Sequence, residues 1–586
     1  MKRTIYFPLL LLVLATLALS TGGCDTLDPT DRLDKEPSGR LDTEDVFSER
    51  ELVEGFLANT YKEGVPLYFN SYRFFSWKTQ ATDIASHSQY SRNAANKWNN
   101  GLQTPSYHPW RLNLFQGESG PTFWDQFYSG IRQANLFLEN TKPASAYEGL
   151  DEEERAQMMA EARVLRAFFH AELLKNYGAR DQGIPIADRS YPADYDFSQV
   201  TRASYDSTAR WIARECDQAA QNLPPTRRSN EEVRAAASWA YAIKSRTLLY
   251  AASPLNNPEG DTEKWRRAAD AAQQVLDIDG YQLDPNYGFI FKNGQDESTG
   301  IIWQHPRENS QWANYINAIP WVGGYRAGVL PTQELVDMYE MKDGTVPILG
   351  YEDADRTEPI INPESSYDPE NPYENRDSRF YQSIYYNGAP YGETTGGEPR
   401  HIMEIYEGGV DEVVAPGSDR THTTTGYYLK KWITPSWYRN ETGEAYWPIF
   451  RLAEFYLNFA EAENEVNGPT PAVYDAVNAV RERAGQPDLP QGLSQSEMRQ
   501  RIRRERTVEL AFEEHRFHDV RRWEILEETN QHITGMRITQ NDDGSFDHER
   551  FVVEERQAWQ ERFLVQPTPL EELQRLSNVE QHDLWK

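Results

Sequence analysis

Two stretches of the chain combine aromatic rings with amide, carboxylate and guanidinium groups, and this combination suits the binding of sugars. The first stretch runs from Trp77 to Asn100 and the second from Trp303 to Arg326. An aromatic face stacks on the C–H face of a sugar ring, while the polar groups bind its hydroxyls. We select ten candidate ligand-binding residues: Trp77, Asp83, Tyr90, Trp98, Asn99, Trp312, Tyr315, Trp321, Tyr325 and Arg326. The competing interpretation of each aromatic residue is packing in the core or within a loop.

Motifs for other chemistry are absent from the sequence. It has no GxSxG elbow, Walker A loop, GxGxxG turn, HExxH helix or CxxC pair. A glycoside hydrolase needs only two suitably spaced carboxylates, however, and the 91 acidic residues offer many pairs. An all-α glycoside hydrolase is therefore one alternative to a binding protein.

Two patterns raise the question of a metal. His515 and His518 lie one helical turn apart, a spacing that can ligate a metal ion. They stand among arginines, so we interpret them as surface or packed histidines. The acidic stretch 543–554 resembles a calcium loop, but His548 occupies the position where an EF-hand needs glycine. We expect a solvated acidic turn there, and neither a metal nor a cofactor.

Composition excludes several classes of protein. The 586 residues are 39% hydrophobic and 26% charged, which indicates a globular chain rather than a disordered one. The net charge of −31 disfavours nucleic acid, and a polyanionic substrate would need a local basic pocket. Aromatic residues reach 12%, with 33 Tyr and 16 Trp, which supplies many rings for stacking on sugars.

The first residues of the chain have the pattern of an export signal. Lys2 and Arg3 precede an apolar run from Ile5 to Leu19, which is too short to remain as a membrane span. Cys24, directly after two glycines, resembles the lipidation site of a bacterial lipoprotein, so residues 1–23 are the predicted signal peptide. An acyl anchor would hold the chain to a membrane without spanning it. The alternative is simple secretion with an unmodified Cys24.

The second cysteine, Cys216, lies on an apolar helical stripe with Ile212 and Ala220. Because a lipidated Cys24 leaves it without a partner, we expect no intramolecular disulfide. We interpret Cys216 as a packed core thiol rather than a nucleophile.

Helical patterns position these candidate residues. Apolar residues recur at helical spacing in 43–61, Phe123 to Asn140 and Asp151 to Tyr177, and then in three further segments, 204–223, 230–252 and 262–278. Short turns and rows of alanine in the later segments indicate tetratricopeptide-like helix pairs. Three more helices are predicted between Arg451 and Trp523. Gly468 and Gly485 end the first two of them, and a capping box of Ser494 and Glu497 begins the third.

The segment 503–523, RRERTVELAFEEHRFHDVRRW, resembles the C-terminal signature of the SusD/RagB family of outer-membrane lipoproteins. The blocks 451–468 (RLAEFYLNFAEAENEVNG) and 477–485 (VNAVRERAG) resemble preceding family blocks in the same order. The stretches 161–178 (EARVLRAFFHAELLKNYG) and 426–432 (GYYLKKW) also have family counterparts. We interpret the charged residues of the signature as ion pairs of the scaffold rather than ligand contacts: Arg503, Arg504, Glu505, Glu509, Glu513, Arg516, Asp519 and Arg521.

The resemblance implies a mainly α fold, in which tetratricopeptide-like helix pairs form a scaffold with long irregular loop insertions and few short strands. It also implies that the ligand binds in loops near the two aromatic stretches, although no residue there matches a fixed family motif. We divide the chain into 24–280, the SusD-like N-terminal part, and 281–586, the C-terminal part, which together form one compact unit. Within the loop-rich insertion 281–448 we expect a strand pair or two.

The leading functional hypothesis is a lipid-anchored protein of the outer-membrane surface that is not an enzyme. It would capture a nutrient, an oligosaccharide or in some branches of the family a peptide, for a partner SusC-like TonB-dependent transporter. The alternatives are the lipid-anchored glycoside hydrolase and a tetratricopeptide-like adaptor that binds other proteins.

Overall fold

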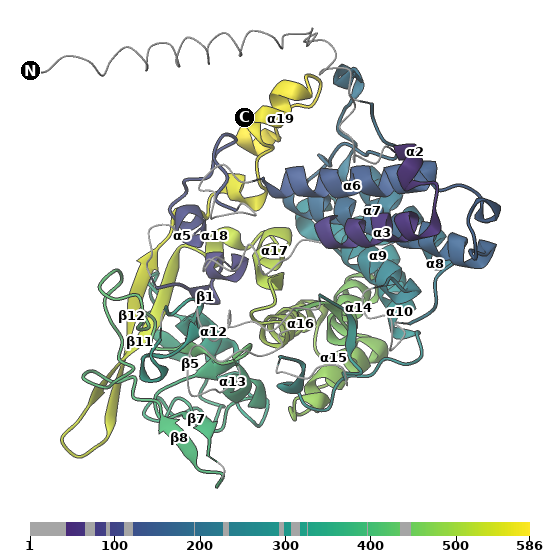
Figure 1. The fold of residues 1–586 in the computed structure, drawn as a ribbon. Helices are drawn as coiled ribbons and strands as arrows, with labels where there is room; N and C mark the ends of the chain where they lie inside the picture. Colours follow the sequence, from purple (N-terminus) through teal and green to yellow (C-terminus); the bar gives the residue numbers. More distant parts are fainter. Residues whose placement is uncertain are drawn as a thin grey trace, which may run out of the picture.

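The computed structural model is mostly helical, with an array of helices on one side and a strand- and loop-rich part on the other (Figure 1). The described residues are 43–64, 77–88, 94–110, 121–192, 194–226, 234–291, 298–305, 317–324, 326–394, 396–433 and 447–586. Within these ranges, no helix is both long and apolar enough to cross a membrane.

The N-terminal half folds as a row of helices in which each packs on the next. Its members are α3 (Arg50–Gly64), α6 (Phe123–Asn140), α7 (Glu152–Tyr177), α8 (Tyr205–Ala220), α9 (Ala237–Ala252) and α10 (Thr262–Leu276). The longest, α7, begins at a capping box in which the Asp151 side chain accepts from the backbone of Glu154. This row confirms the predicted scaffold of helix pairs.

The C-terminal helices continue this row, because α10 packs on α14. They are α14 (Leu452–Asn467), α15 (Pro471–Arg483), α16 (Gln495–Glu509) and α17 (His515–Arg522). Gly468 follows α14 with a φ of 75°, and the predicted capping box of Ser494 and Glu497 opens α16. The family blocks between Arg451 and Trp523 therefore form helices, and α14 joins them to the N-terminal row.

Three predicted helices differ from the structure. The third helix expected between Arg451 and Trp523 is divided into α16 and α17, because Phe512 and Glu514 between them have left-handed φ values of 63° and 69°. The helix expected over 43–61 is divided into α2 (Thr43–Val46) and α3, with Phe47 buried at the break. The helix expected over 230–252 begins at Ala237, because Ala236 is extended and acts as its N-cap. The remaining short helices are α5 (Ala94–Asn99), α12 (Gln333–Met338), α13 (Ser378–Ser383), α18 (Leu526–Thr529) and α19 (Leu570–Arg575).

The described strands form antiparallel pairs, and the expectation of one or two pairs in the insertion was wrong. The pairs are β1 (Ala85–Ser86) with β3 (Leu330–Pro331), β2 (Ile301–His305) with β10 (Trp447–Arg451), β4 (Ile348–Tyr351) with β5 (Pro359–Ile361), β6 (Ile384–Tyr385) with β9 (Tyr428–Leu429), and β7 (Pro390–Glu393) with β8 (Pro399–Ile402). These strands are too short to show a period-2 pattern, and several pair across long stretches of chain. Of residues 426–432, which have a family counterpart, only the two residues of β9 lie in a strand.

A hairpin that was not predicted extends from the loop-rich part as a long ribbon (Figure 1). It consists of β11 (His532–Gln540) and β12 (Phe546–Glu555). Gly544, with a φ of 88°, lies in the turn that joins them, and Asp543 accepts hydrogen bonds from Ser545 in the same turn. The solvated acidic turn expected over 543–554 is present only at the tip of this hairpin, and the rest of that stretch is β12.

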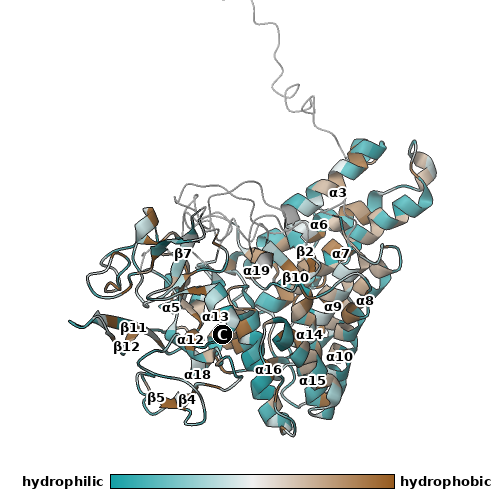
Figure 2. Ribbon diagram, turned by 90° about the horizontal axis from the view of Figure 1, so that it is seen from below, coloured by the Kyte–Doolittle hydropathy of each residue, from teal (hydrophilic) through white to brown (hydrophobic). Residues whose placement is uncertain are grey.

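The largest hydrophobic core draws on both halves of the chain, from Phe47 to Val579. Apolar residues of α7 and α9, such as Phe169 and Trp239, are buried in this core, and hydrophobic segments are coloured brown in these helices (Figure 2). Cys216 lies in this core and burial raises the pKa of its thiol, so the prediction of a packed thiol is confirmed. A second, smaller core lies under the loops around β6 to β9 and includes Tyr385 and Tyr391.

Candidate functional site

Among the described candidate residues, Trp321 is the one whose side chain is only half-buried. It lies in the 3-10 turn η8 (Pro320–Val322), which a proline opens. Gly323 closes the turn with a φ of 75°, a left-handed conformation that glycine adopts readily. Ile319 and Val322, on either side, are buried in the second core and anchor the turn.

The hairpin of β7 and β8 supports the Trp321 ring. Tyr391 and His401 are cross-strand partners in this hairpin, so their side chains lie on the same face. The imidazole of His401 stacks on the indole of Trp321, with ring centroids 4.7 Å apart and an angle of 3° between the planes. The ring of Tyr391 meets the indole edge-on at 6.0 Å. One face and one edge of the indole are therefore fixed.

Asp411, which is fully buried, connects the Trp321 turn to the β7–β8 hairpin through hydrogen bonds. Its Oδ2 accepts a hydrogen bond from His401 Nε2 at 2.6 Å and from the Glu404 amide at 3.2 Å. Its Oδ1 accepts from the Trp321 amide at 3.3 Å, and its backbone carbonyl accepts from the Tyr428 hydroxyl at 3.0 Å. Burial raises the pKa of Asp411, and the hydrogen bond from His401 opposes this effect.

We call Trp321, Tyr391, His401 and Asp411 the Trp321 platform. The Trp321 ring is held by Tyr391 of β7 and His401 of β8. The side chain is therefore ordered before a ligand stacks on it, which lowers the entropic cost of binding. This rigidity suits recognition of a flat apolar surface such as one face of a sugar ring.

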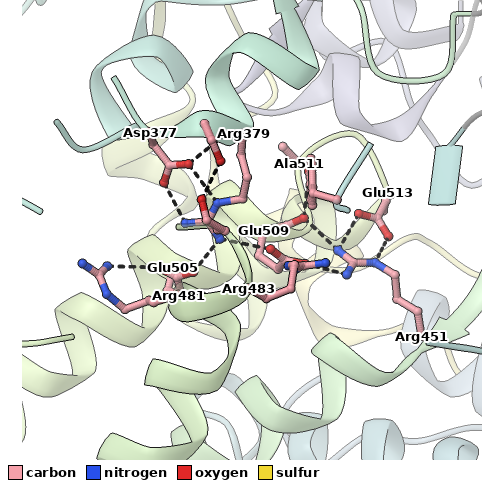
Figure 3. A network of polar contacts seen from close by, with 12 residues as sticks. Asp377, Arg379, Arg451, Arg481, Arg483, Glu505, Glu509, Ala511 and Glu513 are labelled. Atoms are coloured by element: carbon pink, nitrogen blue, oxygen red, sulfur yellow. Dashed lines mark hydrogen bonds and ion pairs between the residues drawn. The ribbon is translucent and has the colours of Figure 1, made fainter. Parts of the chain in front are cut away.

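A buried network of ions fixes the frame that carries these loops (Figure 3). Its centre is Glu509 of α16, whose Oε1 lies 2.6 Å from Nη1 of Arg451 and also meets Arg483 of α15. Its Oε2 lies 3.0 Å from Nη1 of Arg379 in α13. Burial favours the neutral acid, but Arg483, Arg451 and Arg379 together hold the pKa of Glu509 well below its ordinary value.

The network extends in both directions from Glu509 (Figure 3). Arg379 also pairs with Asp377 at 2.7 Å and with Glu505 at 2.5 Å, while Arg451 pairs with Glu513 at 2.6 Å. Since α13 leads directly into β6, these pairs connect the signature helices to the loop-rich part. For Glu505, Glu509 and Glu513 the predicted role of scaffold ion pairs agrees with these contacts.

The other described candidates lie inside the protein. Trp77 packs edge-on against Trp447 at 5.6 Å, and Trp98 packs against Phe563 at 5.3 Å; neither indole is exposed. These contacts match the competing interpretation of core packing. The polar candidates are also buried: Asp83, Asn99 and Arg326 are 1%, 2% and 8% exposed.

Asp83 and Asn99 have partners within the chain. Both carboxylate oxygens of Asp83 accept from the guanidinium of Arg516 in α17, at 2.8 and 2.6 Å. The side-chain amide of Asn99 donates to the carbonyl of Gln80 at 3.1 Å. Four candidates, Tyr90, Trp312, Tyr315 and Tyr325, and the predicted lipidation site Cys24 lie outside the described residues.

Three members of the Trp321 platform were missed by sequence reasoning: Tyr391, His401 and Asp411. They lie in the segment that lacks helical period, where no motif distinguishes them from their neighbours. The available signal was the hairpin pattern itself, two short polar and aromatic segments around Gly396 and Gly397, which places Tyr391 opposite His401.

His515 and His518 are packed in the interior, where burial holds the pKa of each well below its ordinary value. Nearby cations, Arg246 for the first and Lys78 for the second, act in the same direction. In the described part of the chain, no three or more His, Cys, Asp or Glu side chains gather closely enough to hold a metal ion.

Comparison with known proteins identifies the family. A family model described as the SusD family matches residues 288–585, more than half of the chain. The chain belongs to the SusD/RagB family. A second SusD-like model, described as starch-binding and associating with the outer membrane, matches residues 31–249. The resemblance inferred from the signature blocks is thus confirmed.

Known SusD-like proteins resemble this chain along most of its length. SusD-like protein P25 of Formosa agariphila is 24% identical over 415 residues, which are 69% of this chain and 70% of the relative. The crystal structure of a SusD-like protein from Bacteroides fragilis has a TM-score of 0.73 and 25% identity, and covers 94% of this chain and 100% of its own. A SusD-like carbohydrate-binding protein of the same species has a TM-score of 0.70 at 23% identity, over 91% of this chain and 100% of its own.

Proposed function

We propose that this SusD family member is a lipid-anchored protein of the bacterial surface that captures an oligosaccharide. Its lipid anchor would be attached at Cys24, after removal of the signal peptide that the first residues resemble. Captured ligand would pass to a SusC-like TonB-dependent transporter in the outer membrane. The task is binding and hand-over, so no bond is made or broken.

The observation that carries this proposal is the Trp321 platform. A half-buried indole, stacked on His401 and fixed through Asp411, offers a stacking surface in the loop-rich part of a chain with many aromatic residues. The solved relative described as a carbohydrate-binding protein supports the same ligand class. The family description as starch-binding and outer-membrane-associated supports both the ligand class and the location.

The proposal is tested by a glycan-binding screen with the mature chain, beside Trp321→Ala and a matched variant, Trp98→Phe. We expect Trp321→Ala to weaken binding of the best glycan by about tenfold, since the substitution removes the apolar area that the indole buries together with its stacking, which for aromatic pairs is worth about 0.5–1.5 kcal/mol beyond that area. Trp98→Phe changes a fully buried ring far from solvent and should leave affinity unchanged if the protein stays folded.

The same samples distinguish binding from catalysis. Each glycan that binds is incubated with the wild-type chain, and the products are separated by chromatography. Intact glycan after prolonged incubation supports capture, whereas released oligosaccharides would favour the hydrolase alternative. Equal glycan affinity of the wild type and Trp321→Ala would contradict the proposed site.

A further inference from the structure

A second group of aromatic rings lies at the surface between α7 and α8, on a segment that shares no residue with the Trp321 platform. Tyr191 and Tyr195 are half-buried, with ring centroids 4.5 Å apart. Tyr195 meets Phe197 edge-on at 5.2 Å. Phe197 packs on the main core, whereas among the described residues neither tyrosine belongs to a hydrophobic core cluster. The two tyrosines therefore form an aromatic surface outside the core.

An exposed arginine orients this pair. The guanidinium of Arg189 lies 5.5 Å from the centre of the Tyr191 ring. Its interaction with the hydroxyls of Tyr195 and Tyr191 raises the pKa of Arg189. Exposed carboxylates of Asp188 and Asp194 lie in the same segment. We call Arg189, Tyr191, Tyr195 and Phe197 the Tyr191 platform.

The segment is fastened to α6 on one side. Arg132 donates to the carbonyl of Tyr191 at 2.7 Å, and Glu139 accepts from the backbone and hydroxyl of Ser190. These two α6 residues are seven positions apart, so the helix holds the segment over two turns.

The C-terminal region holds the other side. Arg575 of α19 lies 5.7 Å from the Phe197 ring, and the Asn578 side chain donates to the carbonyl of Ser198. Asp196 caps the 3-10 turn η4 (Phe197–Gln199) by accepting from the Ser198 amide at 3.0 Å. The rings are thus presented on a segment with contacts on both sides.

This arrangement has the chemistry of a sugar subsite. The ring faces can stack on a sugar, and a guanidinium and carboxylates at the rim can bind its hydroxyls. Packing of the core explains Phe197 but not the two tyrosines, whose contacts among the rings are with each other, Phe197 and Arg189. We infer that the Tyr191 platform is a second carbohydrate-binding site, separate from the Trp321 platform.

A second site on one chain strengthens binding of a polymer, because the two contacts act together.

The test uses polymeric and short forms of the glycans retained in the screen. Four proteins are compared by affinity gel electrophoresis: wild type, Trp321→Ala, Tyr191→Ala/Tyr195→Ala, and the triple variant. Leu349→Ala/Ile360→Ala is the matched control, because it removes exposed apolar side chains from the β4–β5 hairpin, which contributes no residue to either platform.

We expect Trp321→Ala to bind the polymer weakly. The triple variant should bind it with an affinity at least about tenfold lower than that of Trp321→Ala. The control should match the wild type. Indistinguishable binding by Trp321→Ala and the triple variant would overturn the second site, and so would complete loss of binding in Trp321→Ala alone. If Trp321 does not contact the glycan, Trp321→Ala will bind the polymer as tightly as the wild type does. This outcome is distinct from those that overturn the second site.

Discussion

At the scale of single residues, the buried charge of Glu509 is compensated by several cations. The carboxylate has no exposed surface and meets three guanidinium groups, from Arg379, Arg451 and Arg483 (Figure 3). Buried ions are tolerated only when paired and hydrogen-bonded, so removal of the shared anion leaves several cations without their compensation.

Glu509→Ala should therefore lower the free energy of unfolding by about 3–5 kcal/mol, the usual cost of breaking a buried ion pair. Urea unfolding followed by circular dichroism measures this loss. The matched control is Glu482→Ala, which removes an exposed carboxylate from the neighbouring α15 and should change stability by less than about 0.5 kcal/mol. Equal effects of the two substitutions would show that the network contributes no net stability.

Residue types alone did not separate binding residues from packing residues. Trp77, Trp98 and Trp321 are the same residue in similar aromatic stretches, yet the first two are fully buried and the third is half-buried. Exposure depends on which distant segments cover each ring: β10 covers Trp77 through Trp447, and the C-terminal region covers Trp98 through Phe563. Local sequence does not contain that information.

At the scale of elements, the hairpin of β11 and β12 is held against the loop-rich part by close backbone contact. Met536 donates its amide to the carbonyl of Thr425 at 2.8 Å. Gly426 has a φ of 87°, and a Cβ atom there would lie 2.2 Å from the carbonyl oxygen of Met536. Glycine is therefore required both by conformation and by space.

Gly426→Ala should lower the free energy of unfolding by about 2–4 kcal/mol, from left-handed strain together with the clash. Gly350→Ala in β4 is the control, because the nearest atom to its added Cβ lies 3.9 Å away. Thermal unfolding of the two variants beside the wild type measures the difference. A melting temperature of Gly426→Ala equal to that of the control would contradict the close packing described for this hairpin.

The hairpin is also anchored to α12 by a buried acid. Glu334 accepts from the amide of Thr534 at 3.0 Å and from its hydroxyl at 2.8 Å, and burial raises its pKa to about 7. The unfolded carboxyl releases its proton near pH 4.3, so the folded protein binds more protons between these values. The protonated, buried Glu334 therefore stabilises the fold fully below about pH 4.3, and this stabilisation is lost as the pH rises through about 7.

Glu334→Gln should remove that dependence, because the amide mimics the protonated acid at every pH. We expect wild-type stability to fall relative to that of the variant between pH 5 and pH 8, measured by urea unfolding at both values. A parallel change in the two proteins would show that Glu334 does not carry a shifted proton.

The helices were predictable because their patterns are local. Apolar residues at helical spacing and caps such as Asp151 with Glu154 lie within a few residues of each other. The strands were not predictable in the same way. Tyr385 pairs with Tyr428, and Trp303 with Phe450, so their registers depend on tertiary contacts across many residues. The ten-residue β12 is mostly half-buried and charged, which conceals its strand pattern.

At the scale of the whole molecule, the structure separates a frame from the surfaces that it carries. The helical row and the ion network around Glu509 form the frame, and the proposed Trp321 platform lies in the strand- and loop-rich part beside it (Figure 1). This division agrees with a family in which solved structures share the fold at about 25% sequence identity or less. The frame is retained although the sequences differ widely, whereas the side chains of the loops determine which ligand binds.

The net charge of −31 bears on which ligand such a molecule takes. Exposed carboxylates such as Glu393 and Glu398 belong to the same β7–β8 hairpin that supplies Tyr391 and His401 to the Trp321 platform. They would repel a polyanionic glycan, so we expect neutral oligosaccharides to dominate the ligands retained in the screen.

The central claim is that Trp321 contacts the ligand. It is tested most directly by a crystal structure of the mature chain in complex with the best-binding oligosaccharide. We expect a sugar ring stacked on the indole at about 4 Å, with His401 still packed on the opposite face and hydrogen-bonded to Asp411. A well-occupied oligosaccharide that makes no contact with Trp321 would contradict it.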